Sequence, residues 1–350
     1  MPDHIIDLST ALQWRDEGAL VIDVRTPAEF AEATIPGAVN VPILDNLERA
    51  EIGTLYRQQG PSLARQRGVE MVSPRIPGLI QMVRDQRNNT ERPVLVFCWR
   101  GGLRSRSMVE FLNLAGIPAV QVVGGFKAFR THVLEFLEKG EWGRLFVLRG
   151  LTGVGKTRLL KRLEADGYPI LDLEGLANHR GSAFGALGLT EQPGQKAFET
   201  ALWEALRCIP PGGWALSEGE SRNIGKLQLP EQVYKALQVE TSLWLEAPLD
   251  LRVQMILEDY PAQDDAKEAF VRPLEALKRR LGKERVAGFL QLLEDGEWEE
   301  LVRQLMVDYY DPLYKYRKPE QCLDVEFSSE DEGVARLKVA INELLDASAC

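Results

Sequence analysis

Short apolar runs alternate with amphipathic segments along the first 140 residues. The runs Leu20–Val24, Pro93–Phe97 and Ala119–Val123 have the length and the β-branched content of buried strands. Between the last two runs, apolar residues recur at helical spacing from Arg104 to Ala115, and a second helical pattern extends from Phe126 to Glu138. Strands that alternate with helices predict a parallel sheet.

The alternation stops at the glycine-bearing stretch 140–143 and then begins again. A strand is predicted at Leu145–Leu148, followed by a glycine-rich turn and a helix from Thr157 to Ala165. We expect a domain boundary near 138–144, which gives an N-terminal α/β domain over 1–138 and a C-terminal α/β domain over 144–350. Further predicted segments are strands at Pro169–Leu173, Trp214–Ser217, Thr241–Glu246 and Leu323–Phe327, a helical extension over 248–317, and a loop insertion within 57–92.

Composition agrees with a two-domain globular protein. The chain has 350 residues, of which 45% are hydrophobic and 27% charged. The first 140 residues hold 16 Lys or Arg and 16 Asp or Glu, so the net charge of −10 falls on residues 141–350. An acidic chain is a poor non-specific nucleic-acid binder, but a local basic surface can still hold a structured RNA.

The compartment predicted from the sequence is a reducing cytoplasm. No apolar run reaches the roughly 18 residues needed to cross a bilayer, and the first residues lack the features of a signal peptide. The four cysteines are widely spaced and form no C-x-x-C motif, which argues against a disulfide framework or a cysteine-rich zinc site.

Cys98 is the cysteine whose setting predicts chemistry. It follows the strand that ends at Phe97, and two glycines come before the next helix. Such a turn can direct backbone N–H groups inward as an anion cradle, which would favour a thiolate suited to nucleophilic attack. A buried structural cysteine is the alternative. The predicted loop residues around the catalytic Cys98 are Trp99, Arg100, Gly101, Gly102 and Arg104.

The first domain resembles the rhodanese family of sulfurtransferases. The resemblance rests on residues 21–25, 29–30, 35–42, 98–105 and 124–129. It implies that Cys98 carries the transferred atom. The loop is one residue longer than the common sulfur-transfer loop and is closer in length to that of related arsenate reductases and phosphatases. A longer loop could admit a larger atom or a tetrahedral oxyanion.

The glycine-rich turn of the second domain matches the phosphate-binding pattern G-x-x-x-x-G-K-[ST] between a strand and a helix. Backbone amides of 153–157 would hold a di- or triphosphate, Lys156 would neutralise it, and the Thr157 hydroxyl could bind Mg²⁺. No nucleotide-base motif follows, so a nucleotide and a non-nucleotide diphosphate both remain open. The predicted phosphate-binding residues are Gly150, Gly153, Val154, Gly155, Lys156 and Thr157.

Several acids and donors could serve this second site. Glu218 ends an apolar run in the manner of a Walker B carboxylate, Glu220 is its rival, and Asp172 and Glu174 could face substrate or metal. Solvated loop charges or helix caps are the alternative reading. The full candidate set is Asp172, Glu174, His179, Arg180, Glu218, Glu220 and Arg222.

The order of the two domains resembles the tRNA 2-selenouridine synthase family. Further shared segments are 172–185, 220–225 and 309–314, so the resemblance extends over nearly the whole chain. The fold it implies is α/β, with an N-terminal rhodanese-like parallel-sheet domain and a C-terminal P-loop NTPase-like domain carrying a helical extension.

The resemblance also implies a reaction and its partners. The substrate is tRNA with 2-thiouridine at the wobble position (U34), in which selenium from selenophosphate replaces sulfur. The resemblance also implies an S-geranyl-2-thiouridine intermediate made from geranyl diphosphate. An enzyme that supplies selenophosphate is a further implied partner. We assign selenium to Cys98 and the prenyl diphosphate to 150–157, because the two predicted anion sites differ in chemistry.

Interleaved aromatic and basic residues predict the tRNA contacts, because they suit stacking on unpaired bases with phosphate contacts. The candidates are Tyr314, Lys315, Tyr316 and Arg317, with solvated helix faces as the alternative. The apolar residues Leu202, Trp203 and Leu206 are expected to be core rather than a prenyl groove. Two other functions stay open: a P-loop kinase or ATPase fused to a cysteine-dependent sulfurtransferase or phosphatase, and a non-enzymatic binding module.

Overall fold

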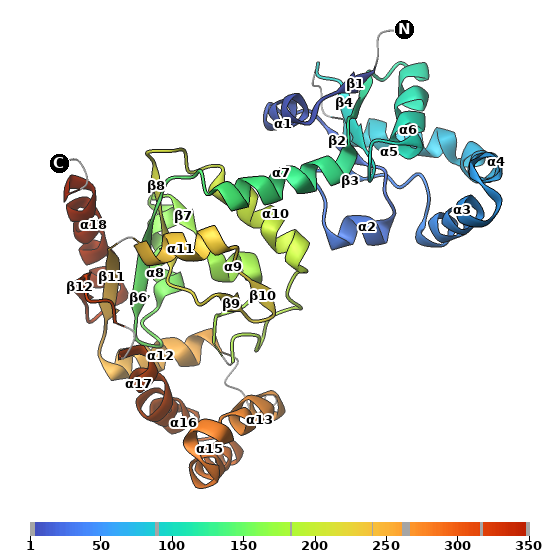
Figure 1. Ribbon diagram of the computed structural model, residues 1–350. Coiled ribbons are helices and arrows are strands. Elements are labelled where there is room, and N and C mark those ends of the chain that lie inside the picture. Colours follow the sequence, from blue (N-terminus) through green and yellow to red (C-terminus); the bar gives the residue numbers. More distant parts are fainter. Residues whose placement is uncertain are drawn as a thin grey trace. The chain divides into compact units, whose positions relative to one another are not determined.

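Two parallel β-sheets organise the chain, as the alternation of strands and helices predicts (Figure 1). Figure 1 is a computed structural model, and the residues that the structure describes are 4–87, 91–182, 184–239, 241–260, 267–315 and 318–347. The chain separates into two units, Met1–Phe136 with Glu199–Glu204, and Leu137–Phe198 with Ala205–Cys350.

The first unit places a parallel sheet between helices. Buried apolar side chains of the central strands, such as Ile22 and Val96, pack with Met108 and Leu112 of a neighbouring helix. The strands are β1 (Ile5–Ile6), β2 (Val21–Asp23), β3 (Val39–Asn40), β4 (Val94–Phe97) and β5 (Ala119–Val122), in the order β1-β5-β4-β2-β3. The helices are α1 (Leu8–Asp16), α2 (Pro27–Glu32), α3 (Asn46–Gln59), α4 (Pro61–Val72), α5 (Ile76–Gln86), α6 (Leu103–Leu114) and α7 (Gly125–Lys139), with a 3₁₀ turn at Ser73–Arg75.

The loop insertion predicted within 57–92 is wrong, because helices α4 and α5 occupy most of this segment. Pro61 stands in the first turn of α4, where a missing N–H costs nothing. In α5, Leu79 and Val83 are four residues apart and both buried, so this helix has the apolar stripe of a core-facing element. The many arginines in this segment made the helical spacing of its apolar residues hard to recognise in the sequence.

The second unit has its own parallel sheet. Its strands are β6 (Arg144–Gly150), β7 (Ile170–Leu171), β8 (Trp214–Glu218), β11 (Ser242–Glu246) and β12 (Cys322–Glu326), in the order β12-β11-β6-β8-β7, beside an antiparallel hairpin of β9 (Asn223–Ile224) and β10 (Leu227–Gln228). Around the sheet lie α8 (Lys156–Ala165), α9 (Leu173–Ala177), α11 (Glu231–Val239), α12 (Leu249–Asp259) and α18 (Glu330–Ala347). Helix α10 (Gln195–Leu206) is divided between the units, since its residues Glu199–Glu204 belong to the first. In the part of the chain that the structure describes, no helix has the length and apolar character needed to span a membrane.

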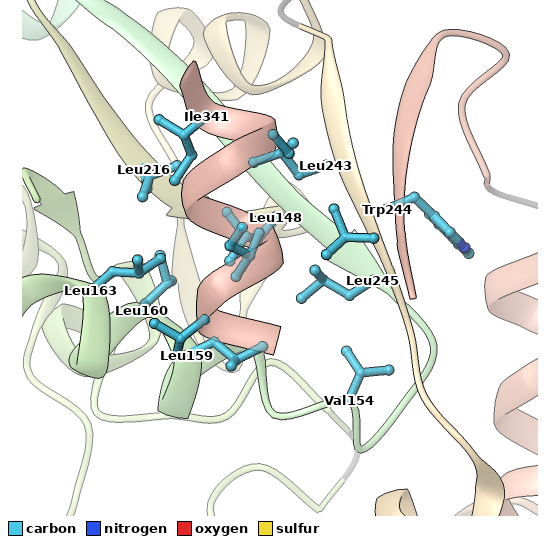
Figure 2. Packing of buried hydrophobic residues seen from close by; sticks show 14 of the residues in the cluster. Leu148, Val154, Leu159, Leu160, Leu163, Leu216, Leu243, Trp244, Leu245 and Ile341 are labelled. Atoms are coloured by element: carbon cyan, nitrogen blue, oxygen red, sulfur yellow. The ribbon is translucent and has the colours of Figure 1, made fainter. Parts of the chain in front are cut away.

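Leucine-rich packing fixes the sheet of the second unit to its helices (Figure 2). Leu148 of β6, Leu245 of β11, Leu159 and Leu163 of α8 and Ile341 of α18 all belong to one buried cluster. Full burial of such a side chain contributes about 1.5–3 kcal/mol. The cluster therefore holds β6 and α8, the two elements that flank the glycine-rich turn, in a fixed relation.

The predicted helical extension is confirmed and forms a small core of its own. Phe270, Leu274, Phe289, Leu301 and Leu305 are buried against one another. The helices that contribute are α13 (Lys267–Ala276), α14 (Lys278–Leu281), α15 (Lys283–Asp295) and α16 (Trp298–Leu305), continued by a π-helical turn (Met306–Tyr310) and α17 (Asp311–Lys315).

A buried ion pair links this extension to the glycine-rich turn. Arg252 of α12 and Asp311 of α17 form two parallel hydrogen bonds of 2.8 Å each, and both side chains are buried. The same guanidinium donates to the carbonyl oxygen of Thr152 at 3.1 Å. One arginine thus fixes the turn, α12 and α17 together.

Substitution of Asp311 should show how much this link contributes. Asp311→Ala leaves the Arg252 charge buried without its partner, so we expect the free energy of unfolding of the second unit to fall by about 3–5 kcal/mol. Urea denaturation followed by fluorescence measures it. Asp250→Ala is the matched control, because Asp250 pairs with Arg303 at 2.6 Å while remaining 85% exposed. A loss below about 1 kcal/mol is expected there, and equal losses would contradict the assignment.

Candidate functional sites

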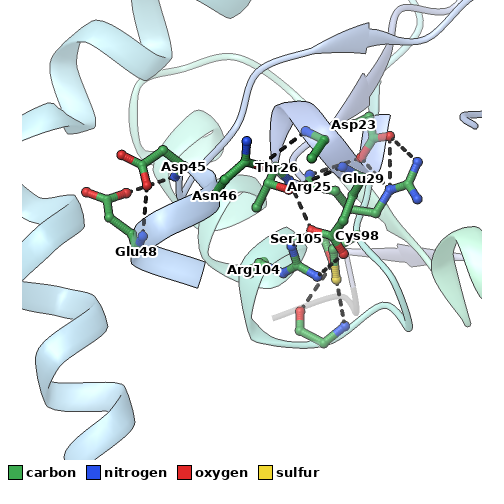
Figure 3. A network of polar contacts seen from close by, with 12 residues as sticks. Asp23, Arg25, Thr26, Glu29, Asp45, Asn46, Glu48, Cys98, Arg104 and Ser105 are labelled. Carbon is green, nitrogen blue, oxygen red and sulfur yellow. Dashed lines mark hydrogen bonds and ion pairs between the residues drawn. The ribbon is translucent and has the colours of Figure 1, made fainter. Parts of the chain in front are cut away.

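The Cys98 sulfur lies at the start of α6, held by two donors (Figure 3). The backbone N–H of Gly102 and the hydroxyl of Ser105 each reach Sγ at 3.2 Å. The residue is 3% exposed. The sulfur thus sits at the positive end of a helix dipole with two hydrogen bonds directed at it, an arrangement that stabilises an anion. The anion cradle expected from the sequence has this physical basis.

The first turn of α7 holds the cysteine loop through backbone hydrogen bonds. Phe126 N–H donates to the Cys98 carbonyl at 2.8 Å, and Lys127 N–H donates to the Trp99 carbonyl at 2.9 Å. Gly125 has a φ of +56°, and a Cβ atom there would lie 2.2 Å from the Cys98 carbonyl oxygen. A side chain at this position would therefore displace the loop.

The loop arginines do not contact the sulfur. Arg104 donates to Glu29 of α2 at 2.6 Å. Burial alone would raise the pKa of Glu29, but the hydrogen bond and charge of Arg104 outweigh burial and lower it. Arg100 is exposed and lines an open cavity with Lys127. The sequence placed Arg100 and Arg104 in the Cys98 loop, but it did not indicate that the Ser105 hydroxyl donates to the sulfur.

The glycine-rich turn of the second unit connects β6 to α8 and packs on α12. Gly153 and Gly155 have φ values of +78° and +70°. A Cβ atom at Gly153 would lie 2.9 Å from the Arg252 carbonyl oxygen, and one at Gly155 would lie 2.9 Å from Sδ of Met255. Because α8 begins at Lys156, the first N–H groups of the helix lack partners within the helix and can face an anion. This is the geometry of a phosphate-binding loop.

Three carboxylates stand beside that loop: Glu218 and Glu220 are buried, and Glu174 is half-buried. Thr157 Oγ1 donates to Glu174 at 2.9 Å, and the Leu173 N–H donates to Glu218 at 3.2 Å. The other Glu218 oxygen, Oε1, has no hydrogen-bond partner in the described part of the chain. Burial is the main cause that raises the pKa of all three, with the charge of a neighbouring carboxylate adding to it for each, and the pKa of Glu220 reaches about 7.

Of the four remaining predicted acids and donors, one lines the phosphate-loop cavity and three do not. Arg180 joins Glu174 and Glu220 in the lining of the phosphate-loop cavity. Asp172 instead caps α9, accepting from Gly175 N–H at 2.6 Å, which is the alternative reading. His179 Nδ1 accepts from Gly181 N–H at 3.1 Å, and burial followed by the Arg180 charge lowers its pKa. Arg222 is exposed and outside the cavity lining.

A cavity of about 320 Å³ joins the phosphate loop to the helical extension. This volume lies in the range of small-molecule sites. Its polar lining comes from residues of the loop and from Arg158, Lys161, Glu174, Arg180, Glu220 and Asp259, and its remaining wall is largely apolar. That wall is formed by Phe184, Ile256, Leu257, Phe270, Leu274, Trp298, Leu301, Val302, Leu305, Met306 and Tyr310.

The residues predicted to contact tRNA are only partly described. The Tyr314 ring lines this cavity, 5.8 Å from the Lys156 ammonium. Tyr316 and Arg317 lie outside the described residues, as does the side chain of Lys315. Leu202, Trp203 and Leu206 are buried, as expected for core residues.

The fold and the two loops define a class of protein in which a rhodanese-like domain precedes a P-loop domain. Residues 7–132 match the rhodanese-like domain family, and residues 143–342 match the tRNA 2-selenouridine synthase AAA domain. The chain belongs to the tRNA 2-selenouridine synthase family.

Relatives of that name resemble this chain over most of their length. The tRNA 2-selenouridine synthase of Cupriavidus necator is 34% identical, with 91% of this chain and 93% of the relative covered. Those of Nitrosomonas europaea and Pseudomonas fluorescens are each 35% identical, covering 89% and 90% of this chain and 92% and 93% of the relatives.

The raised pKa of Glu220 predicts a pH dependence of stability. A carboxyl group whose pKa is near 7 in the folded state and near 4.5 when unfolded binds an extra proton between these values. Stability contributed by that proton is present below about pH 4.5 and is lost as the pH rises through 7.

We therefore expect Glu220→Gln to flatten the decline in melting temperature between pH 5 and pH 8. The difference from wild type should reach about 3 kcal/mol at most. Thermal denaturation at several pH values measures it, with Glu164→Gln on the exposed face of α8 as control. Parallel profiles for wild type and Glu220→Gln would exclude a buried titrating carboxyl.

Proposed function

We propose that this protein replaces sulfur by selenium in 2-thiouridine at the wobble position of tRNA, using two sites for two steps. The names of its relatives support the reaction. The observation that supports the division is the cavity of the second unit, which has a phosphate loop at one end and an apolar wall beyond it. A prenyl diphosphate has the same two-part character.

The two steps balance as follows. The 2-thiouridine sulfur attacks C1 of geranyl diphosphate, diphosphate leaves, and N3 loses its proton. Selenophosphate and water then convert the S-geranyl base to 2-selenouridine, releasing geranylthiol and phosphate. Alkylation makes the sulfur of 2-thiouridine a better leaving group, because it can then leave as geranylthiol. The first step thereby prepares the second.

In the first step, the phosphate loop would hold the diphosphate. The N–H groups at the start of α8 and the Lys156 ammonium supply positive potential. Over the described residues, no group of three or more His, Cys, Asp and Glu side chains could hold a metal ion. If Mg²⁺ takes part, Thr157 and Glu174, whose side-chain oxygens lie 2.9 Å apart, would hold it, and it would neutralise charge on the diphosphate.

In the second step, Cys98 would hold the selenium of selenophosphate beside C2 of the S-geranyl base, so that selenium displaces geranylthiol and water takes up the phosphoryl group. The sulfur already accepts two hydrogen bonds at a helix N-terminus, so an anionic form is stabilised there. A kinase or ATPase is the second candidate, since a P-loop also suits a nucleotide. The apolar wall favours a flexible hydrocarbon tail instead.

Two variants should separate the sites. Lys156→Ala should lower S-geranyl formation at least about hundredfold, because a charge-assisted contact to phosphate is lost. Cys98→Ala should form the S-geranyl product at the wild-type rate and yield no 2-selenouridine. Nucleoside mass spectrometry on 2-thiouridine tRNA, with geranyl diphosphate, selenophosphate, both or neither, measures this. If Lys156→Ala geranylates tRNA normally but fails at selenation, the division is wrong.

The apolar wall predicts that the cavity selects among prenyl diphosphates by the length of the prenyl chain. Phe270 of α13 and Trp298 of α16 pack edge to face, with ring centroids 5.0 Å apart, and both line the cavity. Trp298→Ala should enlarge this part, raising transfer from farnesyl relative to geranyl diphosphate about tenfold by burying the additional carbons.

Competition between the two donors, read by mass spectrometry of the tRNA nucleosides, measures that ratio. Leu290→Ala is the matched control, because Leu290 packs on the core of the helical extension without lining the cavity. An unchanged donor ratio in Trp298→Ala would place the tail elsewhere.

A further inference from the structure

Two buried polar side chains in the first unit are not explained by the fold. Ser105 lies in the first turn of α6 and is 0% exposed, and Gln121 is 7% exposed in β5 among apolar residues. A buried polar group without hydrogen bonds is costly, so its position in a core calls for partners. Both lie next to the Cys98 loop.

The partners form a relay that ends on sulfur. The Gln121 amide, through Nε2, donates to Ser105 Oγ at 2.8 Å and to the Gly102 carbonyl at 3.0 Å. Ser105 Oγ lies 3.2 Å from Cys98 Sγ and equally 3.2 Å from the Gly102 carbonyl oxygen. The single hydroxyl proton of Ser105 therefore has two acceptors to choose from.

Gln121 biases that choice. Its amide uses one N–H on the Gly102 carbonyl and the other on the serine oxygen, so the carbonyl already has a donor and the hydroxyl is oriented. The remaining acceptor for the serine proton is sulfur. A thiolate accepts such a bond strongly, whereas a neutral thiol accepts it weakly. The relay therefore favours the anionic form of Cys98.

We propose that Ser105 and Gln121 are positioning residues that hold Cys98 as a reactive thiolate. The inference rests on the role of Cys98 given above. The charged groups around the loop supply no direct alternative among their described contacts. These groups are the Asp23–Arg25 pair after β2, the Glu29–Arg104 pair between α2 and α6, and the exposed Arg100.

Alkylation of Cys98 by iodoacetamide tests the relay directly. The thiolate attacks the methylene carbon and iodide leaves, so the rate reports the anion at sulfur. In the full-length protein, Ser105→Ala should slow Cys98 alkylation at pH 7 about tenfold and move its rate–pH profile to higher pH. Ser105→Thr, which keeps the hydroxyl, should restore the rate to within about twofold.

Two further variants separate the relay from packing. Gln121→Leu should slow alkylation by a smaller factor, since the serine proton can then turn to the Gly102 carbonyl. Ser107→Ala, the same change on the half-buried side of the same helix, should leave the rate unchanged. Peptide mass spectrometry follows Cys98, and the exposed Cys208 in each sample is the internal reference.

Either of two results would overturn the inference: an unchanged rate and profile in Ser105→Ala, or a threonine variant as slow as the alanine variant. Melting temperatures show that each variant is folded. The assay needs no tRNA, prenyl donor or selenophosphate. Failure of the relay is therefore distinguishable from failure of the proposed function, which only the tRNA assays report.

Discussion

The second unit depends on the ion pair between Arg252 and Asp311. It joins residues more than fifty positions apart and also holds the Thr152 carbonyl of the phosphate loop. A buried pair of charges is costly to desolvate and is tolerated where its geometry satisfies both partners. Here the result is a helical extension fixed at the mouth of an anion-binding loop.

Both loops use the same physical device for different chemistry. Each follows a parallel strand and ends at a helix N-terminus, where unpaired N–H groups favour an anion. In the first unit, the group that occupies the cradle is the Cys98 sulfur, held by Gly102 and Ser105. In the second unit, residues of the loop and Lys156 line a cavity. One loop is thus suited to present a nucleophile and the other to bind a ligand.

The sequence predicted those parts that depend on neighbours in the chain. The strand–loop–helix around 150–157 and the Cys98 loop carry local patterns of apolar residues and glycines, and both are present. Strands of two residues, such as β1 and β3, are too short for any period to be seen. Ser105 belongs to the segment 98–105 that the sequence analysis considered. Its role depends on Gln121, however, and only the pairing of β4 with β5 places Gln121 next to it. The cavity wall likewise needed the tertiary structure, since most of its residues lie between Ile256 and Tyr310, far along the chain from the loop.

The two ends of the cavity differ in how they respond to ionic strength. Attraction between the phosphate loop and a charged head group weakens as added salt screens it, over a Debye length of about 8 Å at physiological strength. Contact between the wall and an apolar tail is unaffected by such screening and is strengthened by salts that are excluded from apolar surface. Sodium chloride and sodium sulfate at equal ionic strength would therefore change the affinity for a ligand with both parts by different amounts. A loop that binds only a nucleotide lacks the apolar contribution. A dependence of affinity on the kind of salt, and not only on ionic strength, is therefore characteristic of this site.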